Sequence, residues 1–90
     1  MTSLQQRLER AERAVEWAQA RAERLLRWAE ATGKLAPHEV PAVRAELREL
    51  VPFARFVNGT WAPPADLIPN LPAQVAMVAM MQAWEQEIAR

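Results

Sequence analysis

The sequence predicts an all-α fold, a three-helix antiparallel bundle. It would combine a long, coiled-coil-like N-terminal helix, a Pro-kinked second helix and a buried C-terminal helix. Three observations lead to this prediction. Residues 3–32 contain neither glycine nor proline. Residues 75–81 carry no polar side chain, so a helix there is apolar on all sides and must be covered on all sides. No segment alternates between apolar and polar residues in the manner of a strand, so we expect no β-sheet.

The composition indicates a single helical domain over residues 1–90. The 11 basic and 11 acidic residues cancel, and the absence of cysteine excludes disulfides and thiolate metal sites. A small chain without such cross-links must depend on helix packing or on association with other chains. The N-terminus lacks a signal-peptide pattern, and no apolar run approaches the ~20 residues that span a bilayer. We therefore expect a cytoplasmic protein with no membrane contact.

The first predicted helix spans residues 3–32. Ser3 and Gln6 have the spacing of a capping box, and Gly33 supplies the C-terminal stop. The residues between them are mostly strong helix formers. The apolar ones follow a heptad pattern, and the small alanines among them imply that a neighbouring helix approaches closely. The a and d positions are Leu4, Leu8, Ala11, Val15, Ala18, Ala22, Leu25, Ala29 and Thr32.

Two tryptophans widen this stripe. Trp17 and Trp28 belong to a repeat with an offset of 11 residues, about three turns, so they point in almost the same direction. They extend the apolar face to about half of the helix circumference. Such a face is wider than a two-stranded coiled coil needs and is typical of a helix packed against a bundle or between two chains.

The second predicted helix spans residues 39–58. Its apolar stripe is spaced by four, three, four and three residues, and it consists of Val43, Leu47, Leu50, Ala54 and Val57. Pro52 lies inside the stripe and cannot donate to the carbonyl of Arg48, so we expect either a kink or two short helices. Asn58-Gly59 is interpreted as the stop signal of this helix.

Residues 60–70 are expected to form an extended, proline-rich link, and residues 71–89 the third helix, capped by Asn70. Trp61 in the link has two interpretations: a plug that folds back onto the bundle, or an anchor presented to a partner. Three methionines, Met77, Met80 and Met81, are interpreted as core fillers, with an exposed binding groove as the alternative.

Catalytic chemistry has little support in the sequence. His38 is the only histidine and lies in a proline-flanked connection, where a surface or capping role is the simpler interpretation. Asp66 is the only aspartate, and the two glycines are too far apart for a phosphate-binding loop. No metal-ligand spacing occurs. We therefore predict that the chain is not an enzyme and that it holds no cofactor and no metal.

The sequence favours a non-catalytic helical assembly or adaptor protein that acts as a subunit of an oligomer or larger complex. The first helix is longer than the others, and its apolar stripe continues to its start without cover from the chain itself. We expect it to bind a second copy, as a homodimer or higher oligomer, or another protein. The expected partner-binding residues are Leu4, Leu8, Ala11, Val15, Trp17, Trp28 and Trp61.

The alternative is a nucleic-acid-associated or regulatory helical protein that uses the arginine-rich face of the first helix. The glutamates interleaved with those arginines would repel phosphates, which makes a nucleic-acid partner the weaker hypothesis.

Overall fold

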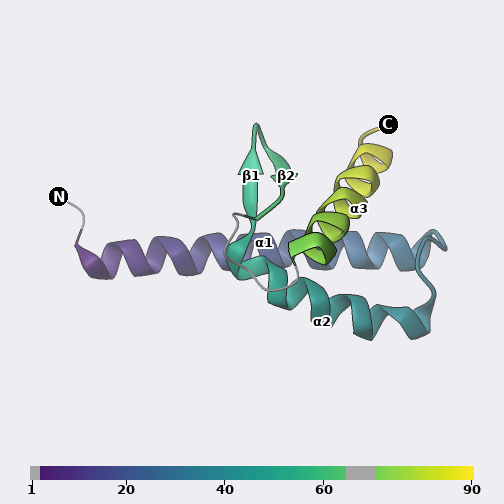
Figure 1. Cartoon of the computed structure of the whole chain (residues 1–90), viewed down its shortest axis with the longest axis horizontal. Coiled ribbons are helices and arrows are strands. Elements are labelled where there is room, and N and C mark those ends of the chain that lie inside the picture. Colours follow the sequence, from purple (N-terminus) through teal and green to yellow (C-terminus); the bar gives the residue numbers. More distant parts are fainter. Residues whose placement is uncertain (1–2, 65–70) are drawn as a thin grey trace.

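The computed structural model describes residues 3–64 and 71–90. A long helix, a shorter antiparallel helix, a small β-hairpin and a final helix follow one another along the chain (Figure 1). The elements are α1 (Leu4–Ala31), the 3₁₀ turn η1 (Pro37–Glu39), α2 (Val40–Leu50), the 3₁₀ turn η2 (Val51–Phe53), β1 (Arg55–Val57), β2 (Thr60–Ala62) and α3 (Leu71–Ala89). The predicted helical character is confirmed, but the expectation of no sheet is wrong.

Both predicted ends of the first helix are confirmed. The Ser3 hydroxyl accepts a hydrogen bond from the Gln6 backbone N–H, and the Gln6 side chain accepts one from the Ser3 N–H, both at 3.2 Å. Gly33 follows the last turn with a φ of 77°, in the left-handed region that favours glycine. The Leu35 N–H then donates back to the Ala29 carbonyl, which fixes the turn toward α2.

The core lies around the second half of α1. There α2 runs back antiparallel to α1, while the hairpin and α3 cover a neighbouring side (Figure 1). The buried apolar side chains come from all of these elements and form one cluster. Its members are Ala18, Ala22, Leu25, Leu26, Ala29, Leu35, Val40, Leu47, Leu50, Val51, Trp61, Val78, Met81 and Trp84.

The predicted kinked helix over residues 39–58 is wrong beyond Leu50. Pro52 lies in η2, where its missing N–H leaves no bond to break, and Ala54 turns to an extended conformation. Asn58 and Gly59 have φ values of 53° and 77°, so they form a two-residue hairpin turn with both central residues left-handed. The strands on either side pair antiparallel, with Phe56 opposite Trp61.

The predicted three-helix bundle with a buried C-terminal helix is not confirmed. One face of α3 is buried through Val78, Met81 and Trp84. The opposite face, which includes Ala76 and Ala79, is exposed to solvent. Alanine loses little by contact with water, although Val75 on the same helix is also 40% exposed. No helix within the described residues is long and apolar enough to cross a membrane.

Candidate docking surface on the first helix

The N-terminal half of α1 extends beyond the rest of the molecule (Figure 1). The heptad stripe there faces solvent: Leu4 is 73% exposed, Leu8 56% and Val15 36%, and Ala11 is exposed as well. From Ala18 to Ala29 the same stripe is buried under the other elements. We call Leu4, Leu8, Ala11 and Val15 the uncovered stripe. It is a continuous apolar surface on the helix half that the rest of the chain leaves mostly uncovered.

An apolar groove adjoins the uncovered stripe where α1 meets η2 and β1. Its volume is about 360 Å³. Every described residue that lines it is apolar, and they are Ala11, Ala14, Val15, Trp17, Ala18, Val51, Pro52, Ala54 and Phe56. The uncovered stripe and the groove are therefore continuous, and together they form one apolar surface, which we call the docking surface.

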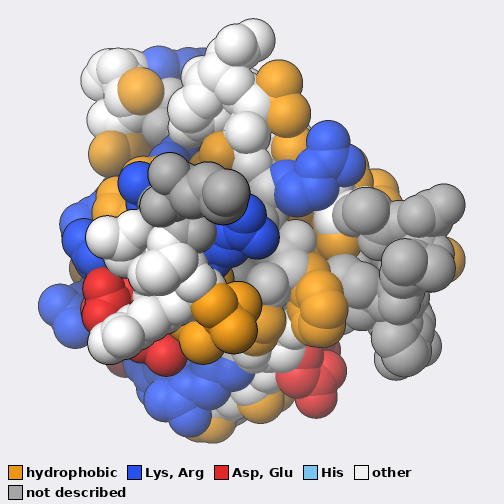
Figure 2. Space-filling view, turned by 90° about the vertical axis from the view of Figure 1, so that its left-hand side faces the viewer, with side chains coloured by type: hydrophobic (Ala, Val, Ile, Leu, Met, Phe, Trp, Pro, Cys, Tyr) orange, Lys and Arg blue, Asp and Glu red, His pale blue; other side chains and the backbone are white. Residues whose placement is uncertain are grey.

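The two edges of the uncovered stripe carry opposite charges. At 3.6 residues per turn, Arg7 and Arg10 fall on one side of the stripe, whereas Glu9, Glu12 and Glu16 fall on the other. All five side chains are exposed. Figure 2 looks at this end of the molecule and shows hydrophobic side chains between basic and acidic ones. A helix that docks on the stripe meets an arginine edge and a glutamate edge.

Arg21 connects the groove to the core. Its guanidinium donates two hydrogen bonds of 2.6 Å to the carboxylate of Glu85 on α3, and a third of 2.8 Å to the Gly59 carbonyl in the hairpin turn. The same group lies over the rings of Phe56 and Trp61 at 4.9 and 5.5 Å from their centroids. One side chain thus joins α1, the hairpin and α3, and it holds the hairpin wall of the groove in position.

Five of the seven predicted partner-binding residues lie together on this surface: Leu4, Leu8, Ala11, Val15 and Trp17. The Trp17 ring, half exposed, packs edge-on against Phe56 at a centroid distance of 4.8 Å. Its indole therefore forms one wall of the groove.

The other two predicted residues lie away from it. Trp61 is only 1% exposed, so the structure places it in the core of its own chain, as the plug interpretation expected. Its carbonyl accepts a hydrogen bond from the Gln82 side chain. Trp28 is half-buried and packs against Trp84 at a ring distance of 6.3 Å. Trp61 is therefore buried within its own chain, whereas Trp28 keeps part of its surface exposed.

The groove residues of η2 and β1 were missed because the second helix was expected to continue through them. Val51, Pro52 and Ala54 face α1 only because the chain turns out of the helix at Pro52. A signal was present in Val57-Asn-Gly-Thr60, in which the turn dipeptide stands between two β-branched residues.

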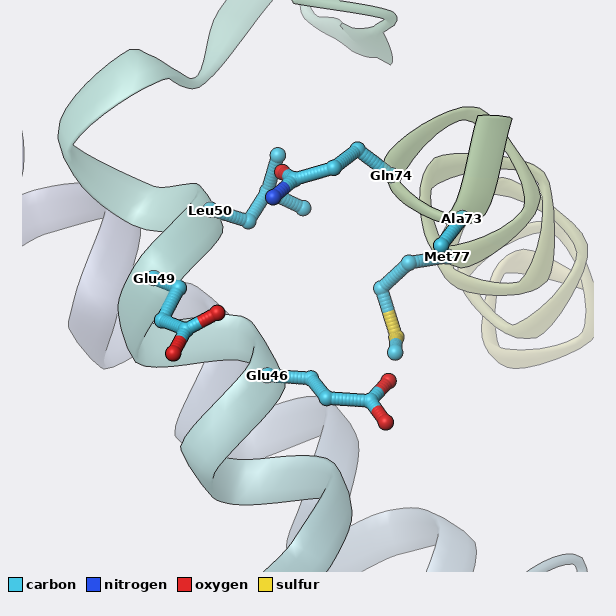
Figure 3. A pocket seen from close by; sticks show the side chains of 6 residues that line it. All are labelled: Glu46, Glu49, Leu50, Ala73, Gln74 and Met77. Atoms are coloured by element: carbon cyan, nitrogen blue, oxygen red, sulfur yellow. The ribbon is translucent and has the colours of Figure 1, made fainter. Parts of the chain in front are cut away.

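A second cleft, of about 270 Å³, separates α2 from α3 (Figure 3). Two carboxylates, Glu46 and Glu49, extend from α2 on one side, with Gln74 and Met77 of α3 on the other. No group of three or more metal-ligating side chains occurs within the described residues. His38 is exposed on η1, and Asp66 lies outside the described residues.

Comparison with known proteins finds no matching family, no similar characterised protein and no similar solved structure.

Proposed function

We propose that this chain is a non-catalytic helical assembly or adaptor protein that works as a subunit of an oligomer or larger complex. The observation that carries the proposal is the uncovered stripe. Exposed apolar surface that is continuous and rimmed by charge usually marks a contact site between proteins. A helix half that stands free in water with leucines on its face gains apolar burial only when something docks on it.

The docking surface offers shape and apolar area, which suit binding rather than chemistry. The groove is lined by apolar side chains, and Trp17 and Phe56 form a rigid aromatic wall beside it. Aromatic residues of this kind are enriched among the side chains that dominate interface energies.

The arginines of α1 give less support to nucleic-acid binding. The Arg13 guanidinium lies 3.7 Å from the Glu9 carboxylate, one helical turn away, and the Arg21 guanidinium forms an ion pair with the Glu85 carboxylate. The glutamate edge of the uncovered stripe would repel phosphates at the same surface.

The proposal is tested by capture with matched baits. The wild-type chain and the variant Leu8→Glu, immobilised separately, are incubated with the purified chain and with a cell extract. Ile88→Glu serves as the control, because Ile88 is similarly exposed (50%, against 56% for Leu8) on α3, outside the docking surface. We expect Leu8→Glu to lose bound protein that the wild type and Ile88→Glu both retain. Equal binding by all three baits would contradict the proposal.

A further inference from the structure

The geometry points to a second copy of this chain as the occupant of the docking surface, packed antiparallel against the uncovered stripe. The two-fold axis would pass between residues 9 and 10 of α1. This inference rests on the proposed function and specifies the partner, its direction and its register.

The stripe is complementary to itself under this rotation. An axis between residues 9 and 10 places Leu8 of one copy opposite Ala11 of the other, and Leu4 opposite Val15. Large side chains then face smaller ones, as close helix packing requires. Leu4 of the second copy also lies beside the groove, whose lining includes Ala11 and Val15. The contact is isologous, which means that each copy uses the same surface. The uncovered stripes of both copies are therefore buried together, and the assembly closes as a dimer.

Steric hindrance excludes the parallel arrangement. In a parallel pair the two first helices would run side by side beyond residue 17. The stripe there is already covered by the chain's own elements, and Ala18 and Ala22 are buried. A neighbouring helix would overlap α2 and η2. The N-terminal half of α1 projects from the rest of the chain (Figure 1), so in the antiparallel arrangement the two projecting halves can meet with the bodies at opposite ends.

The size of the contact predicts a weak dimer. An overlap of roughly 14 residues, about 21 Å of helix, buries on the order of 1,000 Å² in total, which is at the low end for specific interfaces. The antiparallel rotation also brings like edges together, glutamates beside glutamates and arginines beside arginines. Their repulsion is small beside the apolar burial and is screened by ions. The dimer should therefore tighten as salt is raised, the opposite of an interface held by ion pairs.

Spin-label distances test the direction and register. The chain has no cysteine, so single cysteines can be labelled at Gln6, Arg13, Ala20 and Arg27, which are exposed and spaced by seven residues on the outer face of α1. At 1.5 Å per residue, the axial separation between copies should be about 10 Å for Gln6 and Arg13, about 30 Å for Ala20 and about 50 Å for Arg27. The wild-type sequence elsewhere is retained, and the measurement is made at high micromolar concentration.

The expected result is a short distance at Gln6 and Arg13 that lengthens through Ala20 to Arg27. The signal should disappear in Leu8→Glu and persist in Ile88→Glu. Equal distances at all four positions would overturn the inference in favour of a parallel pair. A chain that shows no intermolecular signal, but whose Leu8-dependent capture persists, would overturn the second copy as occupant while the proposed function stands.

Discussion

Removal of the Arg21–Glu85 ion pair should destabilise the protein much more than removal of an exposed pair on the same helix. The Arg21 and Glu85 side chains are only 16% and 24% exposed, and their two hydrogen bonds are both 2.6 Å long. Breaking a buried pair by removing one partner costs about 3–5 kcal/mol, whereas exposed pairs contribute about 0–1 kcal/mol. This partly buried pair lies between these limits, so we expect Glu85→Ala to cost about 2 kcal/mol.

Arg21→Ala should cost more, about 3 kcal/mol, because the guanidinium also bonds to the Gly59 carbonyl and lies over aromatic rings. For a domain of this size that loss lowers the melting temperature by roughly 12–24 °C. The double variant should lose about 3–4 kcal/mol, less than the sum of the single losses, which gives a coupling energy of about 1–2 kcal/mol.

The assay is urea unfolding of the wild type, both single variants and the double variant, followed by circular dichroism. The same double-variant cycle on Arg13 and Glu9 is the control. The Arg13 guanidinium lies 3.7 Å from the Glu9 carboxylate, and the two side chains are 72% and 49% exposed. Its coupling energy should be only a few tenths of a kcal/mol. A coupling energy for Arg21 and Glu85 as small as that of the control would refute the reasoning.

Four further substitutions test the core, the hairpin and the Lys34–Glu87 ion pair by thermal melts. Trp61→Ala should cost about 4 kcal/mol and Trp28→Ala less, about 2–3 kcal/mol, because Trp61 is fully buried and Trp28 only partly; the reverse order would move Trp61 out of the core. Gly59→Ala should cost about 1–2 kcal/mol, since alanine at a φ of 77° is strained, and an unchanged melt would argue against the turn. Lys34→Ala should change stability by less than about 1 kcal/mol, because its 2.9 Å pair with Glu87 is exposed; a larger loss would assign that pair a role in docking α3.

The parts of the fold that could be predicted are those set by local chemistry. The capping box at Ser3 and the stop at Gly33 depend on a few adjacent residues, and both ends of α1 follow from them. The mismatch in helix lengths identified the uncovered stripe, because a helix without neighbours of its own length must leave part of its face exposed.

The hairpin could not be recognised by helical spacing alone. The apolar residues from Val43 to Val57 keep intervals of three and four across Pro52, so a helical period continues where the helix does not. The dipeptide Asn58-Gly59 can form either a helix end or a hairpin turn. Because both residues adopt left-handed φ values and stand between the β-branched Val57 and Thr60, the hairpin is favoured. Pairing of Phe56 with Trp61 then places the indole in the core.

The position of α3 depended on a distinction that hydropathy does not make. Its centre is uniformly apolar, but the outer face carries mainly small side chains such as Ala76 and Ala79, with Val75 40% exposed, and the inner face carries larger ones such as Met81 and Trp84. Size rather than polarity separates the two faces. A prediction based on the absence of polar residues therefore called for more neighbours than the helix requires.

The division of α1 into a supported half and a free half has a consequence for amide hydrogen exchange. Residues 18–31 pack into the core and should exchange slowly, whereas the amides of the first turns of α1, around Leu4 and Leu8, are held mainly by local helix bonds. A free segment of roughly 14 residues is near the length at which an isolated helix is marginal in water. Those amides should exchange quickly in the dissociated chain and slowly once a partner docks. Slower hydrogen exchange at the backbone amides in the N-terminal half of α1 would therefore report partner binding without any substitution in the chain.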